Sequence, residues 1–364
     1  MGQRSGHQER SKKLEMTQSE TMKTKAVVQN NEEASEELNP RKQRLTSVFG
    51  VADLKNGAVG LYNIGLSCCL NSVLQVFLMN IYFTRILRRI TVPPRAAQKR
   101  NVLYQMLLLL EKMQCGKQKA VSPMDLASCL SAYRVKLFAT HDAAQLFLTL
   151  WNLMKMQMEK PELEHLACQK CSLETKRKSS MLILPLSMLD SNSHMLKTLE
   201  DCLQHFFHPV ELTDHNMCLC EQCGKRTPFL QSMKLVHLPH SLTIHLKRFC
   251  FEKSAYIHKL NNNLPFPQDL DFNVILTENQ CQADNNEKAG WQYELFAVVA
   301  HSGSTSFGHY CAYIRSLTEL KWYCFNDSHV CQVSWDDVKT TYGHSSLHLG
   351  ETAYLLIYMK KHLE

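Results

Sequence analysis

Through the first third of the folded sequence, apolar residues are spaced like one face of a helix. The spacing predicts helices over residues 68–79, 102–113 and 142–158. Ser122 followed by Pro123 predicts the start of one more helix, with Ser as the N-cap and Pro at the first helical position. The front third is therefore expected to be helical.

After Pro161 the pattern changes to short runs of β-branched and aromatic residues between polar turns. One helix interrupts these runs at Thr198, where Asp201 completes the spacing of a capping box. The runs predict strands at Met181–Leu186, Ser241–Phe249, Tyr293–His301, Tyr310–Arg315, Lys321–Phe325 and Ala353–Met359. Helices followed by a mostly β half indicate the α+β fold class.

The first residues of the chain differ in texture from the rest. Residues 1–54 are polar and contain an acidic cluster between Glu32 and Glu37. Such a segment cannot bury enough apolar surface to offset its loss of entropy on folding, so we expect a disordered tail. The folded domain is expected over 55–364, helical over about 60–160 and mostly sheet over 161–364.

The composition is that of an ordinary globular protein, since 45% of the 364 residues are hydrophobic and 21% are charged. This excludes a wholly disordered, collagen-like or coiled-coil protein. Because the sequence has no long uninterrupted apolar run and no apolar core of a secretory signal, we expect no membrane insertion. The expected location is the cytoplasm, with the nucleus as a second compartment. The net charge of +7 permits nucleic-acid binding without indicating it.

Cys68 is the candidate nucleophile. It lies where a glycine-containing loop, residues 60–67, leads into the first predicted helix. The partial positive charge of a helix N-terminus favours a thiolate over a thiol, and the thiolate is the reactive form. A single cysteine is more often a buried apolar side chain, so this position alone is weak support.

Two histidines and one polar turn supply the partners that such a thiol needs. His301 ends one predicted strand and His309 opens the next, and either imidazole could hold a thiolate and protonate a leaving amine. Asn326 and Asp327 follow a later strand, and either could accept the imidazole Nδ1–H and direct the other ring nitrogen at sulfur. Residues of these types are also common in ordinary turns.

Two Cys-x-x-Cys pairs predict a metal site. Cys168 with Cys171 and Cys220 with Cys223 supply four thiolates, the ligand set of a closed structural Zn²⁺ site. Cys218 is a competing ligand. The alternative is four unligated cysteines on surface turns, which we disfavour because exposed paired thiols oxidise readily.

Several ordered blocks of the sequence resemble the ubiquitin-specific proteases, a family of papain-like cysteine proteases. Residues 60–75 resemble the family's cysteine box, and 308–310 together with 322–327 resemble its histidine box. Further matches lie at 141–147, 238–249 and 353–358, so the resemblance covers nearly all of the folded part. It implies an α+β papain-like fold with a helical thumb, a β palm and β fingers tied by zinc on the same four cysteines.

Carried over residue by residue, the resemblance implies a role for each candidate. Cys68 is the nucleophile, His309 is the general base and acid, and Asn326 orients the imidazole, with Asp327 in reserve. Asn63 matches the oxyanion residue, which donates to the tetrahedral oxygen together with the Cys68 backbone N–H.

Asp142 matches the carboxylate that pairs with the basic tail of the family's substrate. Leu66 and Ser67 stand where the family usually has Asn-Thr, and Asn326 stands where Asp is more frequent, which predicts slower turnover. Residues 160–167 are shorter than the family's segment at this point, so the fingers are expected to lack a strand at their base.

Residues 83–93 and 106–113 resemble the interferon-induced branch of the family, which removes the interferon-stimulated ubiquitin-like modifier from conjugated proteins. The resemblance thus implies a monomeric cysteine isopeptidase, with structural zinc, that damps interferon responses. The expected partners are the modifier, its protein conjugates and signalling proteins.

Two other function classes stay open. A non-catalytic module could keep the fold and only bind a ubiquitin-like partner in signalling. A zinc-dependent nucleic-acid binder could use the basic stretch 85–100, which contains no acidic residue. A solvated helical face explains that stretch more simply, so no nucleic-acid partner is expected.

Overall fold

The computed structural model describes residues 58–115, 118–136, 139–154, 162–168, 171, 174–251, 257–281, 291–344 and 350–361, with the backbone alone at 162–168, 174–180, 251 and 279. Contacts between Cα atoms divide the chain into Met1–Asp53 and Leu54–Glu364. The tail predicted at residues 1–54 lies outside the described residues, all of which belong to the second unit.

The described residues up to 154 are mainly helical, as the apolar spacing predicts. Helix α3 packs against α4 and α8, where the rings of Phe77 and Phe147 stack with their centroids 4.9 Å apart. The helices are α3 (Cys68–Met79), α4 (Ile81–Leu87), α5 (Arg95–Gln98), α6 (Val102–Gln114), α7 (Met124–Ser131) and α8 (Ala143–Met154). Two short strands, β1 (Gly60–Leu61) before α3 and β2 (Ala120–Val121) between α6 and α7, pair in parallel.

Side-chain caps explain where several helices begin. Thr198 forms the predicted capping box with Asp201 at the start of α9 (Leu199–Phe207). The helix expected to include Pro123 begins one residue later: Pro123 is its N-cap, and the Ser122 hydroxyl accepts a hydrogen bond from the Met124 N–H at 3.3 Å. The shorter helices are α10 (Phe272–Ile275), α12 (Trp335–Lys339), η2 (Asp214–Asn216), η3 (Glu278–Gln280) and η4 (Thr340–Tyr342).

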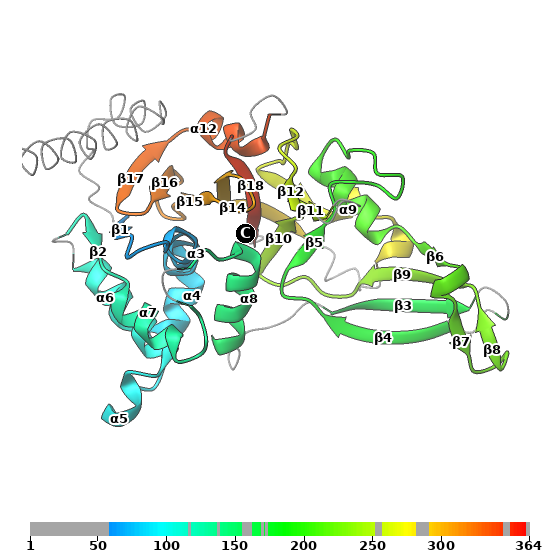
Figure 1. Cartoon of the computed structure of the whole chain (residues 1–364), viewed down its shortest axis with the longest axis horizontal. Helices are drawn as coiled ribbons and strands as arrows, with labels where there is room; N and C mark the ends of the chain where they lie inside the picture. Colours follow the sequence, from blue (N-terminus) through cyan, green and yellow to red (C-terminus); the bar gives the residue numbers. More distant parts are fainter. Residues whose placement is uncertain are drawn as a thin grey trace, which may run out of the picture. The chain divides into compact units, whose positions relative to one another are not determined.

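One large sheet covers α3 (Figure 1). Its strands follow the order β17-β16-β15-β14-β18-β10-β5, and β13 pairs with β14. The strands are β5 (Leu184–Leu186), β10 (Ser241–Leu246), β13 (Asp269–Asp271), β14 (Gln292–Gly303), β15 (Gly308–Arg315), β16 (Trp322–Asn326), β17 (His329–Val333) and β18 (Thr352–Lys360). All pairs are antiparallel except β10 with β5.

The strand predicted over Ser241–Phe249 divides in two. The Arg248 N–H bonds the Leu246 carbonyl at 2.7 Å, so the chain turns here. It continues as a separate hairpin of β11 (Phe249–Phe251) and β12 (Ile257–Lys259). The Arg248 side chain points inward and is completely buried.

The expectation that the fingers lack a strand at their base is wrong. Residues 162–168 form β3 (Glu162–Cys168), which pairs with β4 (Glu174–Ser180) on one side and β9 (Phe229–Leu235) on the other. With β6 (Val210–Leu212) these strands form a sheet of order β4-β3-β9-β6, and β7 (Cys218–Cys220) with β8 (Lys225–Thr227) forms a hairpin at its end (Figure 1). Although the segment is short, residues 162–168 themselves form the strand that pairs with β4 and β9.

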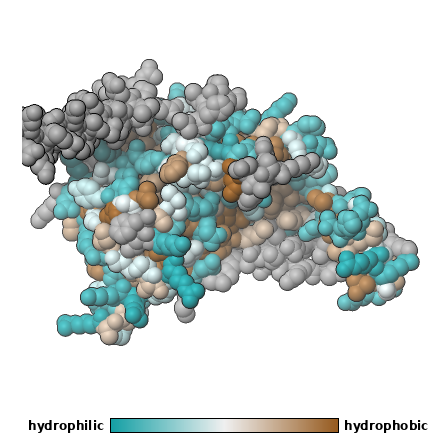
Figure 2. All heavy atoms as spheres, in the orientation of Figure 1, coloured by the Kyte–Doolittle hydropathy of each residue, from teal (hydrophilic) through white to brown (hydrophobic). Residues whose placement is uncertain are grey.

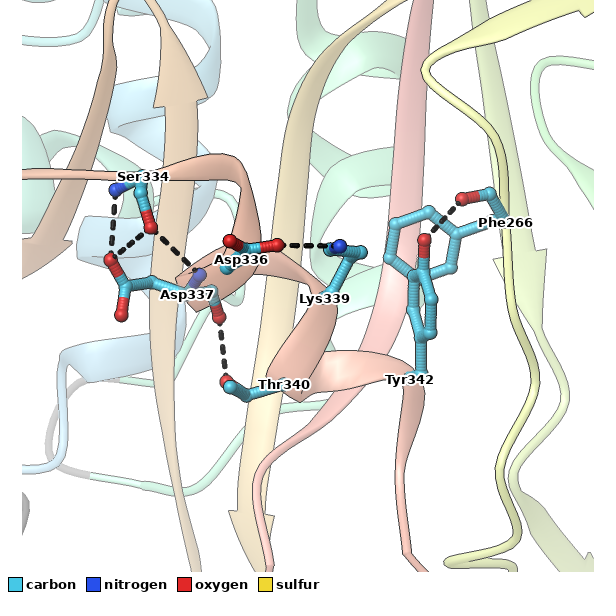
Figure 3. A network of polar contacts seen from close by, with 7 residues as sticks. All are labelled: Phe266, Ser334, Asp336, Asp337, Lys339, Thr340 and Tyr342. Carbon is cyan, nitrogen blue, oxygen red and sulfur yellow. Dashed lines mark hydrogen bonds and ion pairs between the residues drawn. The ribbon is translucent and has the colours of Figure 1, made fainter.

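The helix α12 and the turn after it are tied by local polar contacts (Figure 3). Ser334 and Asp337 form a capping box, and the Thr340 hydroxyl donates to the Asp337 carbonyl at 2.6 Å. The Tyr342 hydroxyl donates to the Phe266 carbonyl at 2.8 Å, which fixes the chain just before β18.

The basic stretch is exposed. In Figure 2 the corner formed by α5 is coloured hydrophilic. The exposed basic residues of this stretch are Arg85, Arg88, Arg89, Arg95, Lys99 and Arg100. Among the described helices none by itself is long and apolar enough to cross a bilayer; α3 and α4 pass such a test only as a pair bent by 84°.

Candidate active site

The loop before α3 brings the thiol of Cys68 to the helix N-terminus. Gly65 and Leu66 both have positive φ, +99° and +50°, and turn the chain so that the helix begins at Cys68. The Cys68 side chain is half-buried, whereas Cys69 is buried. Burial, followed by the charges of Cys68 and Asp142, raises the pKa of Cys69 well above its usual value. Of the two neighbouring thiols, Cys68 is thus the accessible one.

His309 and Asn326 meet across β15 and β16. The ring atom Nε2 of His309 lies 2.6 Å from Oδ1 of Asn326. From the sequence we expected Nδ1 to face the orienting residue, and the structure reverses the ring. Since Nε2 is taken by Asn326, Nδ1 is the nitrogen left for the hydrogen bond that His309 makes with Cys68.

The surroundings of His309 favour its charged form. Burial by itself lowers the pKa of His309, but the hydrogen bond and charge of Cys68 raise it, as does the hydrogen bond to Asn326. The net result is a pKa of about 9. The imidazole is therefore protonated at neutral pH and can stabilise a thiolate.

Asp327 does not touch the imidazole. Its Oδ2 accepts a hydrogen bond from the Asn63 side chain at 2.9 Å, and its Oδ1 accepts one from Asn71 at 2.7 Å. The Asp327 carbonyl also accepts the Leu61 N–H at 3.0 Å. Asp327 therefore fastens the turn after β16 to the loop before Cys68, and of the two candidate orienting residues Asn326 is the one that hydrogen-bonds the base.

Asn63 shapes the loop that leads to the thiol. Its Oδ1 accepts hydrogen bonds from the backbone N–H groups of Gly65 at 2.9 Å and Ser67 at 3.3 Å. Its Nδ2 donates one hydrogen to Asp327 and keeps a second one. Sequence reasoning missed Asn71, which is 2% exposed; the available signal was a polar residue among the apolar residues of the helix, a signal that Ser72 and Gln75 also give.

His301, the other candidate base, is part of the packing. It is buried, and its ring packs edge-on against Phe249 and lies 4.6 Å from the Tyr310 ring. Burial, then the charges of Lys259 and His309, lower the pKa of His301 to about 3. A Cβ at Gly308 would come within 1.9 Å of the His301 Nε2, so glycine is required there for the ring to fit.

Asp142 lies just before the first residue of α8. Its Oδ1 accepts the Gln145 N–H at 2.8 Å, and its Oδ2 accepts a hydrogen bond from the Tyr354 hydroxyl. The carboxylate is also close enough to raise the pKa of Cys69 and of Tyr310 through its charge. The Asp142 carboxylate therefore lies near Cys69 and Tyr310, which follow the nucleophile and the base in the sequence.

The fingers contain a cluster of thiols. The sulfur atoms of Cys171, Cys220 and Cys223 all lie within 4.8 Å of one another, and the first two are 3.5 Å apart. Three thiols at this spacing fit the donor set of a structural zinc ion, which they could hold. Cys218 lies outside the cluster and donates to the Asn216 carbonyl. Cys168 ends β3 opposite Phe229, and its side chain lies outside what the structure describes.

A thiol at a helix N-terminus, beside a histidine that an asparagine orients across a β-sheet, defines a papain-like cysteine hydrolase of the α+β class. Comparison with known proteins gives the same class. Residues 59–358 match the family model described as "Ubiquitin carboxyl-terminal hydrolase". The chain belongs to this family, so the fold class expected from the sequence is confirmed.

Individual relatives show how close the similarity is. The chain is 51% identical to "Ubl carboxyl-terminal hydrolase 18" of Homo sapiens over 343 residues, covering 90% of this chain and 92% of that protein. It is 49% identical to the Mus musculus protein of the same name over 341 residues, covering 89% and 92%. It is 27% identical to "Ubiquitin carboxyl-terminal hydrolase 47" of Xenopus tropicalis over 378 residues, covering 84% of this chain and 28% of that protein.

Proposed function

We propose that this chain is a cysteine isopeptidase that removes a ubiquitin-like modifier, the interferon-stimulated one, from lysines of conjugated proteins. The observation that carries the proposal is the contact of His309 with both Cys68 and Asn326, in a chain about half identical to "Ubl" hydrolases along almost its whole length. A module that only binds its partner would have no need of this contact.

The acylation step follows from the protonation of the pair. The Cys68 thiolate attacks the carbonyl carbon of the modifier's C-terminal glycine, and the π electrons move to the carbonyl oxygen. The His309 imidazolium then gives its proton to the lysine amine as the C–N bond breaks. The product is a thioester on Cys68 with a neutral imidazole beside it, and Asn326 holds the ring in place through Nε2.

The tetrahedral oxygen needs donors that are already in place. The backbone N–H of Cys68 and the second hydrogen of Asn63 Nδ2 serve as these donors, because Asp327 and the loop amides fix the Asn63 amide plane. Deacylation reverses the roles: neutral His309 takes a proton from water, and the resulting hydroxide attacks the thioester. Cys68 then leaves as thiolate.

The remaining parts of the proposal concern the fingers and the setting. Cys168 would complete a four-thiolate zinc site with Cys171, Cys220 and Cys223, and the ion would stabilise the fingers rather than take part in the reaction. Asp142 would pair with a basic residue of the modifier's tail. We place the activity in the cytoplasm and nucleus, where removal of the modifier would damp interferon responses.

Hydrolysis of fluorogenic C-terminal amides tests the proposal. Ubiquitin and the two-domain interferon-stimulated modifier serve as parallel substrates for the purified chain. We expect hydrolysis with a higher kcat/KM for the second substrate, and loss of activity in Asn326→Ala through kcat. Hydrolysis of neither amide, despite measurable binding of the modifier, would overturn the proposal in favour of a non-catalytic binding module.

A further inference from the structure

The Asp142 carboxylate is held from two sides. The Gln145 N–H fixes Oδ1 at 2.8 Å, and the Tyr354 hydroxyl donates to Oδ2. In the part of the chain that the structure describes, no lysine or arginine forms an ion pair with it. Two of the carboxylate's four lone-pair positions are occupied, which leaves two for an incoming donor. Asp142 is therefore oriented without being neutralised by a cation from the described residues.

Tyr354 has little freedom to point its hydroxyl elsewhere. The residue lies on β18 and is 1% exposed. Its ring contacts those of His245, Phe249 and Tyr310, with centroid distances of 4.8, 5.0 and 5.9 Å. Burial, then the charge of Asp142 and the hydrogen bond to it, raise the pKa of Tyr354, so the hydroxyl stays protonated and remains a donor.

We propose that Tyr354 is a positioning residue that aims the Asp142 carboxylate at a basic residue in the modifier's tail. The assignment rests on the proposed function, because it concerns the recognition of that substrate. A guanidinium binds a carboxylate best through two parallel hydrogen bonds, and these require a fixed carboxylate plane. The Gln145 N–H alone fixes one oxygen and lets the plane turn, whereas the second bond from Tyr354 stops that rotation.

The role acts through Asp142 and differs from a general contribution to packing. Tyr354→Phe keeps the ring and its contacts with the neighbouring rings, and removes only the hydroxyl. The matched control is Tyr358→Phe. Tyr358 lies on the same strand, is also buried, and donates to the Pro267 carbonyl at 2.7 Å. Both variants lose one buried hydroxyl hydrogen bond, but only the first loses a contact with Asp142.

The test measures KM and kcat for three enzymes on each of two substrates. The enzymes are the unchanged chain, Tyr354→Phe and Tyr358→Phe. The substrates are fluorogenic C-terminal amides of the modifier, one with its native tail and one with the basic residue nearest the C-terminus replaced by alanine. The expected result is a rise in KM of about tenfold on alanine replacement for the unchanged chain and the Tyr358 variant, as a charge-assisted pair provides. For Tyr354→Phe we expect about threefold or less, with kcat retained.

Each other outcome has a distinct meaning. If alanine replacement in the substrate raises KM by the same factor for all three enzymes, Tyr354 does not position Asp142 and the assignment is overturned. The same conclusion follows if the unchanged chain hydrolyses both tails equally, since no basic residue is then recognised. If the unchanged chain hydrolyses neither amide, the proposed function itself fails and the assignment fails with it. Thermal melting of both variants shows that the fold is retained.

Discussion

Arg248 is a large, fully buried and charged side chain of the described core. Its replacement tests how the segments around it are held together. The side chain has no exposed surface. Its Nε donates to the Ala353 carbonyl at 2.8 Å, and its two terminal nitrogens donate to Leu260 at 2.9 Å, Asn262 at 3.0 Å and Tyr342 at 2.8 Å. It thus joins β18, the loop after β12 and the turn η4 that Figure 3 shows.

Arg248→Met keeps similar volume and removes all four bonds. Each hydrogen bond to a charged group contributes about 1.5–3 kcal/mol, so the gross loss is large. The desolvation cost of burying the guanidinium offsets part of the stability that these bonds contribute, and the same burial lowers the pKa of Arg248 to about 10. We expect a net loss of about 3–5 kcal/mol, because each buried carbonyl left unpaired costs about 1–3 kcal/mol and the relieved desolvation of the guanidinium offsets part of that sum. At about 2–4 °C per kcal/mol, the melting temperature should fall by about 6–20 °C.

Thermal melting followed by circular dichroism measures the loss. The control is Arg315→Met, which removes an arginine bound to Glu294 with a side chain that is 15% exposed. We expect the control to lose less than Arg248→Met, because it breaks one partly exposed ion pair and leaves no row of buried carbonyls unpaired. If Arg248→Met melts within about 2 °C of the unchanged chain, the four carbonyls do not depend on the guanidinium and the reasoning is refuted.

Three further predictions concern the site and the fingers. The pKa of His309 is raised from 6.5 to about 9, so its charge stabilises the fold fully below pH 6.5, and this contribution and the activity are lost as pH rises through 9. In NMR titration, Cys68→Ala should lower that pKa, and an unchanged value would contradict the ion pair. Asp327→Ala should lower kcat about 10- to 100-fold by freeing Asn63, with KM almost unchanged. A rise in KM as large as the fall in kcat would contradict this role. Chelation of the metal should lower the melting temperature before it lowers the reactivity of Cys68 toward a covalent active-site probe, and Cys220→Ser should have the same effect. An unchanged melting temperature in both experiments would exclude structural zinc.

The element types follow from local patterns, and their ends do not. The apolar face of α8 and the apolar runs of β14 to β16 are visible in the sequence, because the helix buries one face and the strands lie in a continuous core. The division of the strand at Arg248 was not predictable, since four carbonyls from distant segments hold the side chain inward. Residues 162–168 form a strand because β4 and β9 offer partners on both sides, which no local pattern records.

The candidate site shows the same limit. The residue types at Cys68, His309 and Asn326 could be named from sequence because nucleophile, base and orienter have recognisable contexts. Which ring nitrogen faces Asn326 depends on how the His309 side chain packs, so the expectation of Nδ1 was wrong. Tyr354 was missed because one tyrosine in an apolar strand looks like core until Asp142 is placed beside it.

The central claim is that the Cys68 thiolate attacks the C-terminus of a ubiquitin-like modifier. The most direct test is covalent capture with C-terminal propargylamides of ubiquitin and of the interferon-stimulated modifier, followed by mass spectrometry of the digested adduct. We predict an adduct on Cys68, more of it with the second probe, no labelling in Cys68→Ala and full labelling in Cys69→Ala. An adduct on Cys69, or labelling that persists in Cys68→Ala, would contradict the claim.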